Sequence, residues 1–296
     1  MGKAANFTTA FRVSDGRSFR LRDFDPGGRA GIKSKQRARE SLAEGIQALS
    51  DLQGRLYAQD RWTLLVVLQG MDAAGKDSTI EHVMSGVNPQ GCEVHSFRAP
   101  SLEELDHDYL WRAVRRLPER GRIGIFNRSY YEEVLVVRVH PELLARQHLP
   151  PGLVTDGIWG QRFEDINGFE RYLGRNGVVI RKFFLHLSPD EQRRRFLKRL
   201  ENPEKHWKFA AADVTERQSW DAYMRAYEDM IRHTSTPHAP WYVVPADHKW
   251  VARLVVAAAI VDTLRGLDLS PPPLDPERRR ALAAARATLE AEGGRT

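Results

Sequence analysis

Apolar residues follow two patterns along this chain, continuous runs and stripes at helical spacing. The run TLLVVLQ at 63–69 is apolar on both faces, as is typical of a strand buried in the middle of a sheet. Four further runs, CEVHSF, RIGIFN, VVIRKFFLHL and WYVVPA, predict strands at or near Cys92, Ile125, Val178 and Trp241 respectively.

Helical patterns occupy the intervals between these runs. A predicted helix from about 35 to 60 has one apolar face, made by Leu42, Ile46, Leu49, Leu52 and Leu56. Further helices are predicted at 76–84, 103–117, 130–137, 160–173, 189–200, 213–233 and 250–267. Because strands alternate with helices, we predict an α/β fold, a three-layer α/β/α sandwich whose mostly parallel sheet is covered on both faces.

The segments without strand patterns suggest the domain organisation. The first thirty residues look irregular, and together with the helix that follows they form an N-terminal extension, 1–60. The interval 189–239 is dense in Arg, Lys and Trp and predicts a helical excursion from the sheet. The prolines of SPPPLDP cannot continue a helix, so we expect one domain over 1–270 and a proline-led tail, 271–296, with a peripheral helix.

Composition narrows the class of protein only slightly. The 296 residues carry a formal charge of +6, and the pI is near 9.5. This favours an acidic partner, nucleic acid or a phosphate-rich substrate, but it is equally compatible with solubility alone. A single cysteine, Cys92, excludes an internal disulfide. Since no apolar stretch reaches the roughly 18 residues of a membrane helix and no secretory segment is visible, we expect a soluble cytoplasmic protein without a membrane partner.

The stretch GMDAAGKDS has the G-x-x-x-x-G-K spacing of a phosphate-binding loop. It lies between a predicted buried strand and a predicted helix, which disfavours a chance match in a tight turn. Glycines let backbone N–H groups close around phosphate oxygens, and Lys76 can reach the transferred group. The expected phosphate-binding residues are Gly70, Ala73, Ala74, Gly75, Lys76, Asp77 and Ser78.

The two aspartates of this loop are unusual. Asp77 stands where a metal-ligating hydroxyl is common, and a favourable interaction with the positive helix end explains it equally well. A carboxylate at Asp72 would repel phosphates unless Mg²⁺ lay between them. We therefore predict that Asp72 holds the metal or positions the phosphates of a nucleotide.

A second motif, IGIFNRSYYEEVLVVRVHPE, follows the strand expected beside the first one. Asn127 and Arg128 should emerge at its carboxyl end, where ligands bind in open α/β sheets, and Arg128 can clamp phosphate with two N–H groups. Ordinary phosphate-loop NTPases have an aspartate where Asn127 stands. Metal binding should therefore rest mainly on Asp72, with Asn127 as a second candidate.

The third motif is a basic run after residue 189. It contains Arg193, Arg194, Arg195, Lys198 and Arg199 within two helical turns, followed by Lys205 and Lys208. Alone, such a run is usually a solvated helix face. Downstream of a phosphate loop, it predicts a helical lid over about 189–239 that excludes water and spreads cations around a transferring phosphoryl group.

The stretches GMDAAGKDSTI, NRSYYEEVLVVRVHPE, EQRRRFLKRLENPEKHWKF and APWYVVPADHKW resemble the family-2 polyphosphate kinases, over about 19–269. The resemblance implies a P-loop kinase fold with a helical lid, and phosphoryl transfer between inorganic polyphosphate and nucleotides with Mg²⁺, or Mn²⁺ in its place. It implies that Asp72 is the essential acidic residue, that Arg128 contacts polyphosphate, and that lid arginines contact the transferring phosphate. We accordingly expect catalytic roles for Asp72, Lys76, Arg128 and Arg194, and polyphosphate contacts from Arg193 and Lys208.

Many members of that family read DRSWYNR where this chain reads NRSYYEE at 127–133. The variant resembles the subgroup that phosphorylates both AMP and ADP. It implies that Glu132 lies near the acceptor nucleotide, with Asp72, Asn127 and Lys205 as further nucleotide contacts. The family also implies adenine or guanine nucleotides as partners and a homo-oligomer, a dimer or tetramer.

Two other functions are open at this point. An ATP-dependent kinase of a nucleotide or small metabolite would use the same loop and ignore polyphosphate. A nucleic-acid-binding protein would use the basic lid to follow a phosphate backbone, but the loop and Arg128 would then have no role, so we expect no nucleic-acid partner. Direct in-line transfer needs only positioning and electrostatic stabilisation.

Overall fold

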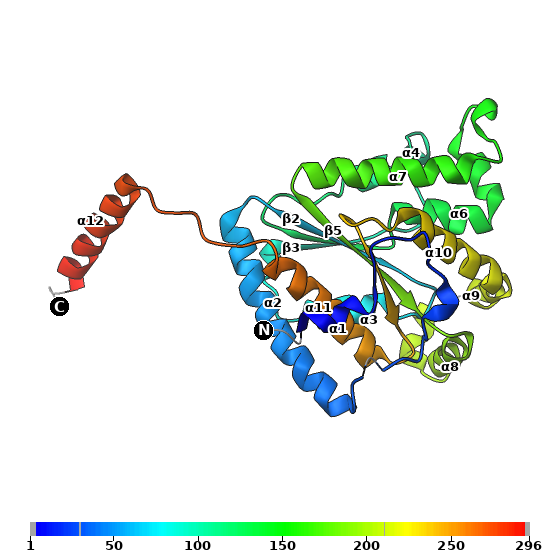
Figure 1. Cartoon of the computed structure of the whole chain (residues 1–296), viewed down its shortest axis with the longest axis horizontal. Coiled ribbons are helices and arrows are strands. Elements are labelled where there is room, and N and C mark those ends of the chain that lie inside the picture. The colour runs from blue at the N-terminus through cyan, green and yellow to red at the C-terminus, as the bar shows by residue number, and fades with distance from the viewer. Residues whose placement is uncertain (1–3, 30, 210, 294–296) are drawn as a thin grey trace.

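A mostly parallel six-stranded sheet forms the centre of the described chain (Figure 1). The computed structural model describes residues 4–29, 31–209 and 211–293. The strands are β1 Arg12–Val13, β2 Thr63–Gln69, β3 Cys92–Ser96, β4 Ile123–Asn127, β5 Val178–His186 and β6 Trp241–Pro245. Their order is β1-β6-β5-β2-β4-β3, and only β1 runs antiparallel to its neighbour. The five predicted strands are confirmed; β1 is too short to leave a pattern in the sequence.

Helices cover both faces of this sheet, so the predicted three-layer sandwich is confirmed. Every residue of the central strand β2 is buried, and successive side chains point into opposite layers. Leu64, Val66 and Leu68 pack in the layer of α2 Lys35–Gln59, α3 Lys76–Val83 and α11 Lys249–Arg265. Leu65 and Val67 pack in the layer of α7 Ile158–Arg175 and α10 Trp220–Thr234. The apolar run in the sequence therefore reflects burial on two sides.

Three segments predicted as single helices are interrupted in the structure. The segment predicted as 103–117 forms two short helices, α4 Leu102–Leu105 and α5 Trp111–Val114, because the Asp108 carboxylate accepts from the Leu110 N–H and makes a turn between them. The segment 130–137 is a 3₁₀ helix, η3 Tyr130–Val134, followed by α6 Val136–Val139. The segment 213–233 is divided into α9 Ala211–Glu216, η7 Arg217–Ser219 and α10.

The N-terminal segment is more regular than the sequence predicts. It forms α1 Ala4–Thr9, then β1, then η1 Leu21–Asp23. The Val13 carbonyl accepts from the Ser235 hydroxyl at 2.7 Å, and the Leu21 N–H donates to Glu228 of α10 at 2.9 Å. These contacts with distant residues cover the β6 edge of the sheet, which local sequence patterns cannot reveal.

The remaining elements are α8 Pro189–Leu200, four short 3₁₀ turns and the last helix of the described chain. α8 has the predicted bounds, and the short 3₁₀ turns are η2 Pro89–Gly91, η4 Pro141–Gln147, η5 Pro151–Leu153 and η6 Pro203–Lys208. α12 Pro276–Gly293 stands apart from the sheet on an extended segment, and residues 270–292 are exposed. Within the described ranges, no helix is long and apolar enough to cross a membrane.

Candidate active site

The loop between β2 and α3 has a conformation that its glycines permit. Gly75 has φ +102°, a region that L side chains rarely adopt. At Gly70, a Cβ atom would lie 3.0 Å from the Leu185 carbonyl oxygen on β5. The spacing that predicts a phosphate loop is therefore required by the backbone itself, at the carboxyl end of β2 and the start of α3.

Lys76 is buried and turned toward its own loop. Its Nζ donates to the carbonyl oxygens of Gly70 at 2.7 Å and Met71 at 3.2 Å. Burial, and secondly the nearby Arg128 guanidinium, lower the pKa of Lys76 to about 8, although the carboxylates of Asp72, Glu132 and Asp77 oppose the shift. The ammonium group is thus fixed in position, but burial disfavours its charged form. A bound phosphate anion would stabilise that charged form.

Arg128 links the loop to the second motif. Its Nη2 donates to Asp72 Oδ1 at 2.8 Å, and its Nη1 lies 3.4 Å from Glu132 Oε2. The Glu132 carboxylate, more than any other group, raises the pKa of Arg128 above its usual range. The backbone of Arg128 has φ +63°, which is strained for a residue with a long side chain. The structure therefore brings together Asp72, Lys76, Arg128 and Glu132, four of the residues to which the sequence analysis assigns a role in the site.

Two buried polar residues that sequence reasoning missed, Gln69 and Ser129, position Glu132. With the Gln69 amide oriented to satisfy its neighbours, its nitrogen donates to Glu132 Oε1 at 2.9 Å and its oxygen accepts from the Ser129 N–H and hydroxyl at 3.2 and 3.0 Å. Burial raises the pKa of Glu132, with Arg128 acting in the opposite direction. A glutamine at the end of an otherwise apolar strand was the available signal.

Asn127 and Asp77 contact each other across the same edge of the sheet. The Asn127 Nδ2 donates to Asp77 Oδ1 at 2.7 Å and lies 3.3 Å from the Ser96 hydroxyl. The Asn127 Oδ1 is buried, and it has no hydrogen-bond partner among the described residues. An unpartnered amide oxygen is a suitable ligand for a hard cation or for its water shell.

The donor set fits a weakly held divalent cation. Across residues 4–29, 31–209 and 211–293, no group of three or more His, Cys, Asp or Glu side chains could enclose a metal ion. Mg²⁺ is commonly bound through one or two carboxylates together with waters and substrate phosphates. Asp72, with Asn127 as an amide donor, matches that pattern, so the residues present fit a metal that arrives with phosphates.

The inner face of α8 holds the phosphate loop from outside. The buried Arg195 guanidinium donates to the carbonyl oxygens of Ala73 at 2.8 Å and Ala74 at 3.0 Å, and to those of Ala246 at 2.5 Å and Asp247 at 3.0 Å. The Gln192 amide donates to the Asp72 carbonyl oxygen at 2.9 Å. These bonds satisfy outward carbonyls of the loop. The Ala74 N–H donates to the Met71 carbonyl oxygen at 3.1 Å, so the N–H groups at the start of α3 are the ones placed to bind an anion.

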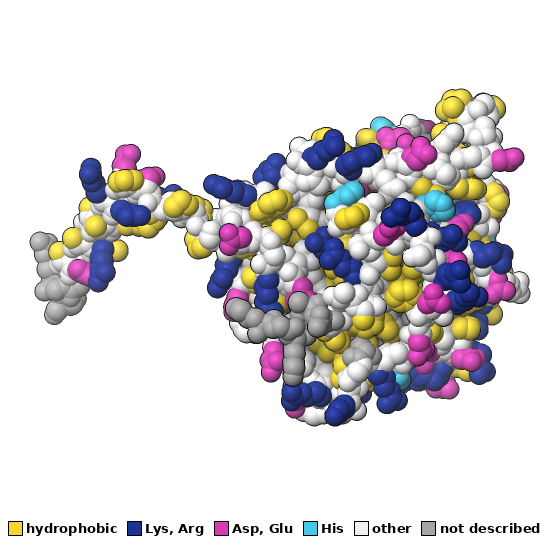
Figure 2. Space-filling view, in the orientation of Figure 1, with side chains coloured by type: hydrophobic (Ala, Val, Ile, Leu, Met, Phe, Trp, Pro, Cys, Tyr) yellow, Lys and Arg dark blue, Asp and Glu magenta, His cyan; other side chains and the backbone are white. Residues whose placement is uncertain are grey.

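Arg193 and Arg194, which the sequence predicted as phosphate contacts, are not brought to the loop. Arg194 is 64% exposed and pairs with Glu191 at 2.6 Å, and Arg193 is exposed. Lys205 and Lys208 lie in η6, but their side chains are outside the part of the chain that the structure describes. On the face seen in Figure 2, Lys and Arg side chains gather, among acidic ones, over the end of the molecule where α9 and α10 lie.

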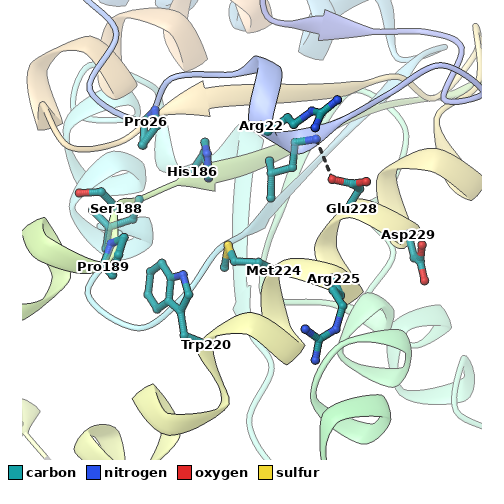
Figure 3. Close-up of a pocket in the computed structure, with 12 residues that line it drawn as sticks. Arg22, Pro26, His186, Ser188, Pro189, Trp220, Met224, Arg225, Glu228 and Asp229 are labelled. Atoms are coloured by element: carbon teal, nitrogen blue, oxygen red, sulfur yellow. Dashed lines mark hydrogen bonds between the residues drawn. The ribbon is translucent and has the colours of Figure 1, made fainter.

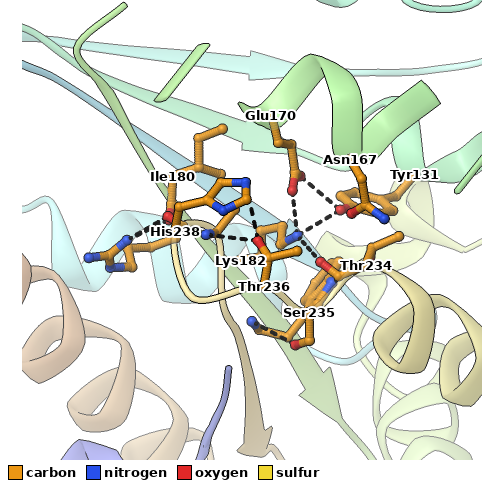
Figure 4. A network of polar contacts seen from close by, with 12 residues as sticks. Tyr131, Asn167, Glu170, Ile180, Lys182, Thr234, Ser235, Thr236 and His238 are labelled. Carbon is orange, nitrogen blue, oxygen red and sulfur yellow. Dashed lines mark hydrogen bonds and ion pairs between the residues drawn. The ribbon is translucent and has the colours of Figure 1, made fainter. Parts of the chain in front are cut away.

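A buried ionic network lies behind the second motif (Figure 4). Lys182 of β5 and Glu170 of α7 are fully buried, with Nζ 2.6 Å from Oε2. The other carboxylate oxygen accepts from the hydroxyls of Tyr130 at 2.9 Å and Tyr131 at 2.8 Å, and Lys182 also donates to the Thr234 carbonyl at 2.7 Å. Burial lowers the pKa of Lys182, while Glu170 opposes the shift. The network anchors η3, which directly follows Arg128 and Ser129; a lysine inside an apolar strand was its only sequence signal.

Comparison with known proteins gives a consistent result. Residues 32–270 match the family model for polyphosphate kinase 2. An ADP-polyphosphate phosphotransferase from Rhodopseudomonas palustris is 51% identical over 283 residues, covering 95% of this chain and 98% of that protein. An AMP/ADP-polyphosphate phosphotransferase from Meiothermus ruber is 47% identical over 263 residues, covering 88% of this chain and 94% of that protein.

A solved structure has the same architecture. The crystal structure of polyphosphate kinase 2 from Arthrobacter aurescens superposes with a TM-score of 0.84 at 38% sequence identity, covering 93% of this chain and 95% of that one.

Proposed function

The chain belongs to the polyphosphate kinase 2 family, and from this premise we propose that it transfers phosphoryl groups, reversibly, between inorganic polyphosphate and both ADP and AMP. It is a phosphotransferase of the P-loop kinase-like fold. The observation that carries the proposal is the convergence of a phosphate loop, the buried Lys76 and the Asp72–Arg128 pair at one edge of the sheet.

The phosphate loop and Arg128 are proposed to bind the phosphates between which transfer occurs. The loop offers backbone N–H groups at a helix N-terminus, and its carbonyls are already satisfied by Arg195 and Gln192. Because burial lowers the pKa of Lys76, a bound anion would stabilise its charged form. Arg128 is strained in the position that places its guanidinium between Asp72 and Glu132. No covalent intermediate is required, because the terminal phosphate of ADP or AMP is itself the nucleophile.

Asp72 is proposed to hold Mg²⁺, or Mn²⁺ in its place, with Asn127 Oδ1 as a second donor and phosphate oxygens completing the site. When bound, the cation neutralises charge on the phosphates. Glu132, Asn127 and Lys205 are proposed to contact the acceptor nucleotide. Glu132 is well placed for this role because Gln69 and Arg128 hold its carboxylate at the edge of the cavity.

The lid is proposed to open for substrate and close over it. The cavity beside Asp72 and Arg128 has a volume of about 40 Å³, and it is bordered by Glu216 and Arg217 of the lid segment. Arg217 is tied to α8 through Gln192, at 2.6 Å. Since such a volume holds waters but no nucleoside, the segment must move to admit a nucleotide. We propose that Arg193, Arg194, Lys205 and Lys208 then contact polyphosphate or the transferring phosphate.

Several broader properties belong to the same proposal. The partners are inorganic polyphosphate and adenine or guanine nucleotides, without nucleic acid. The enzyme works in the cytoplasm as a homo-oligomer, a dimer or tetramer.

The proposal is tested by mixing the protein, Mg²⁺ and polyphosphate with AMP or ADP and separating the nucleotides by chromatography. ADP and ATP should form from AMP, and ATP from ADP, with Lys76→Ala as the inactive control. Turnover with ATP and a small acceptor, combined with indifference to polyphosphate, would identify an ordinary ATP-dependent kinase and overturn the proposal.

A further inference from the structure

A second, larger cavity lies between η1, the end of β5 and α10 (Figure 3). Its volume is about 440 Å³, which is within the size range of small-molecule sites. None of the residues that line it also lines the small cavity beside Asp72 and Arg128. It is therefore a separate space, and the catalytic proposal leaves it without a role.

The walls of this cavity suit a flat heteroaromatic group. Trp220 and Met224, one turn apart on α10, and His186, the last residue of β5, border the same space in Figure 3. Trp220 and Met224 are partly buried and pack against the core on one side only. An indole face and a thioether are surfaces on which a nucleobase stacks well.

His186 adds a flat ring to the wall. Burial lowers the pKa of His186, although Asp247 and a hydrogen bond with the Phe24 backbone oppose the shift. The uncharged ring suits contact with a nucleobase, whereas its Nδ1 is buried, without a hydrogen-bond partner within the described part of the chain, and out of reach of a ligand in the cavity.

The mouth of the cavity offers positive charge. Arg22 and Arg225 line it with exposed side chains, and the structure gives them no ion pair among the described residues. The carboxylates at the same wall are already engaged. Glu228 accepts from the Leu21 N–H at 2.9 Å, and Asp229 accepts from Arg138 at 2.7 Å. Glu228 keeps its negative charge, since the Leu21 N–H is neutral, and in Figure 3 it lies between Arg22 and Arg225, so each arginine offers its own position for a phosphate at the mouth.

We infer that this cavity is a second nucleotide site, separate from the catalytic one. It would take a purine nucleoside phosphate, with the base against Trp220 and Met224 and the phosphate beside Arg225 on the same helix. Ser188 and Pro189 also line the cavity, and they begin α8, whose Gln192 and Arg195 hold the phosphate loop. A bound nucleotide would thus touch the start of the helix that braces the catalytic loop.

Calorimetric titration of the full-length protein with AMP, without polyphosphate or Mg²⁺, tests the inference. The wild-type protein should bind AMP at two sites. Trp220→Ala should weaken one of them by about tenfold or more, as expected for loss of a stacking surface, and Arg128→Ala should weaken the other. Trp220→Phe should keep both, and Arg55→Ala, exposed on α2 at the opposite face of the sheet, is the matched control.

A second variant keeps the test decisive if Trp220→Ala fails to fold. Met224→Ala removes the thioether surface one turn from Trp220, and it should weaken the same site for AMP. A single site weakened by both Trp220→Ala and Arg128→Ala would mean that the cavity holds the base of the catalytic nucleotide, and would overturn the separate site. So would two sites that are both indifferent to Trp220→Ala and Met224→Ala, or a cavity that binds tripolyphosphate but not AMP.

Discussion

The Arg195 guanidinium donates a hydrogen bond of 2.8 Å to the carbonyl oxygen of Ala73, so a lid-helix side chain forms part of the phosphate loop's support. The same guanidinium reaches three further carbonyl oxygens, that of Ala74 in the loop and those of Ala246 and Asp247 after β6. The preceding residue, Arg194, is mostly exposed and pairs with Glu191 on its own helix. Arg194 and Arg195 therefore have different structural roles, which the sequence alone does not distinguish.

We predict that Arg195→Ala lowers both stability and activity. It leaves buried carbonyls unsatisfied, which should cost about 2–4 kcal/mol of unfolding free energy, and the loosened loop should lower turnover by about a hundredfold. Arg194→Ala removes only an exposed pair and should change stability by less than about 1 kcal/mol, while lowering turnover through its proposed phosphate contact. Urea unfolding and steady-state kinetics on both variants measure the contrast. Equal loss of stability in the two would contradict this division of roles.

The loop's two carboxylates should also behave differently. Asp72→Asn removes the charge paired with Arg128 and the proposed metal ligand, so turnover should fall by about two orders of magnitude and half-maximal activity should need more Mg²⁺. Asp77→Asn keeps a polar partner for Asn127 and should stay within about tenfold of wild type. Mg²⁺ titration of each variant is the measurement. An unchanged Mg²⁺ requirement in Asp72→Asn would remove Asp72 from the metal site.

Removing one member of the buried network behind η3 should be strongly destabilising. Lys182→Met leaves Glu170 buried without its cation and should cost about 3–5 kcal/mol, whereas replacing both residues by apolar ones should cost much less. Tyr131→Phe should cost more than Tyr130→Phe, because the Tyr131 hydroxyl also accepts from Lys182 at 2.8 Å, while Tyr130 only donates to Glu170. Chemical denaturation of the single and double variants measures these differences. Equal costs for the two tyrosines would argue against the arrangement in Figure 4.

The lowered pKa of Lys76 predicts that catalytic activity falls on the alkaline side of the pH–rate profile. Its pKa in the folded protein is about 8, so the free enzyme loses the ammonium charge as pH rises through that value, and kcat/KM should fall with it. Bound phosphate favours the charged form, so the corresponding limb of kcat should lie at higher pH. The contribution of Lys76 to folding stability changes with pH in the opposite direction to its contribution to activity. The unfolded lysine holds its proton up to its ordinary pKa of 10.5, so this group makes folding more favourable as pH rises from about 8 toward 10.5.

Rate profiles of the wild type and Lys76→Arg test this assignment. An arginine stays charged throughout the range, so whatever activity Lys76→Arg retains should show no limb near pH 8. Persistence of the limb in that variant would assign it to another group.

Much of the fold and part of the site could be predicted because the signals are local. The run TLLVVLQ and the helical stripe at 35–60 report burial directly, and the strand-loop-helix context of Gly70 to Ser78 is contiguous. The convergence of Arg128 with Asp72 follows from the neighbouring parallel strands β2 and β4, whose carboxyl ends meet at one edge. The break in the helix predicted at 103–117 was missed, since a single side-chain hydrogen bond can decide a turn against a helix.

The sequence by itself determined the α/β class, the phosphate loop and its family, because each depends on residues near one another in the chain. Only the tertiary structure decided which of three consecutive arginines supports the loop. Successive helix positions point about 100° apart, and only the packing of α8 against Ala73 selects Arg195. It also decided the Lys182–Glu170 pair and the cavity between His186 and Trp220, since residues from separate elements meet there only once the sheet and its helices have packed.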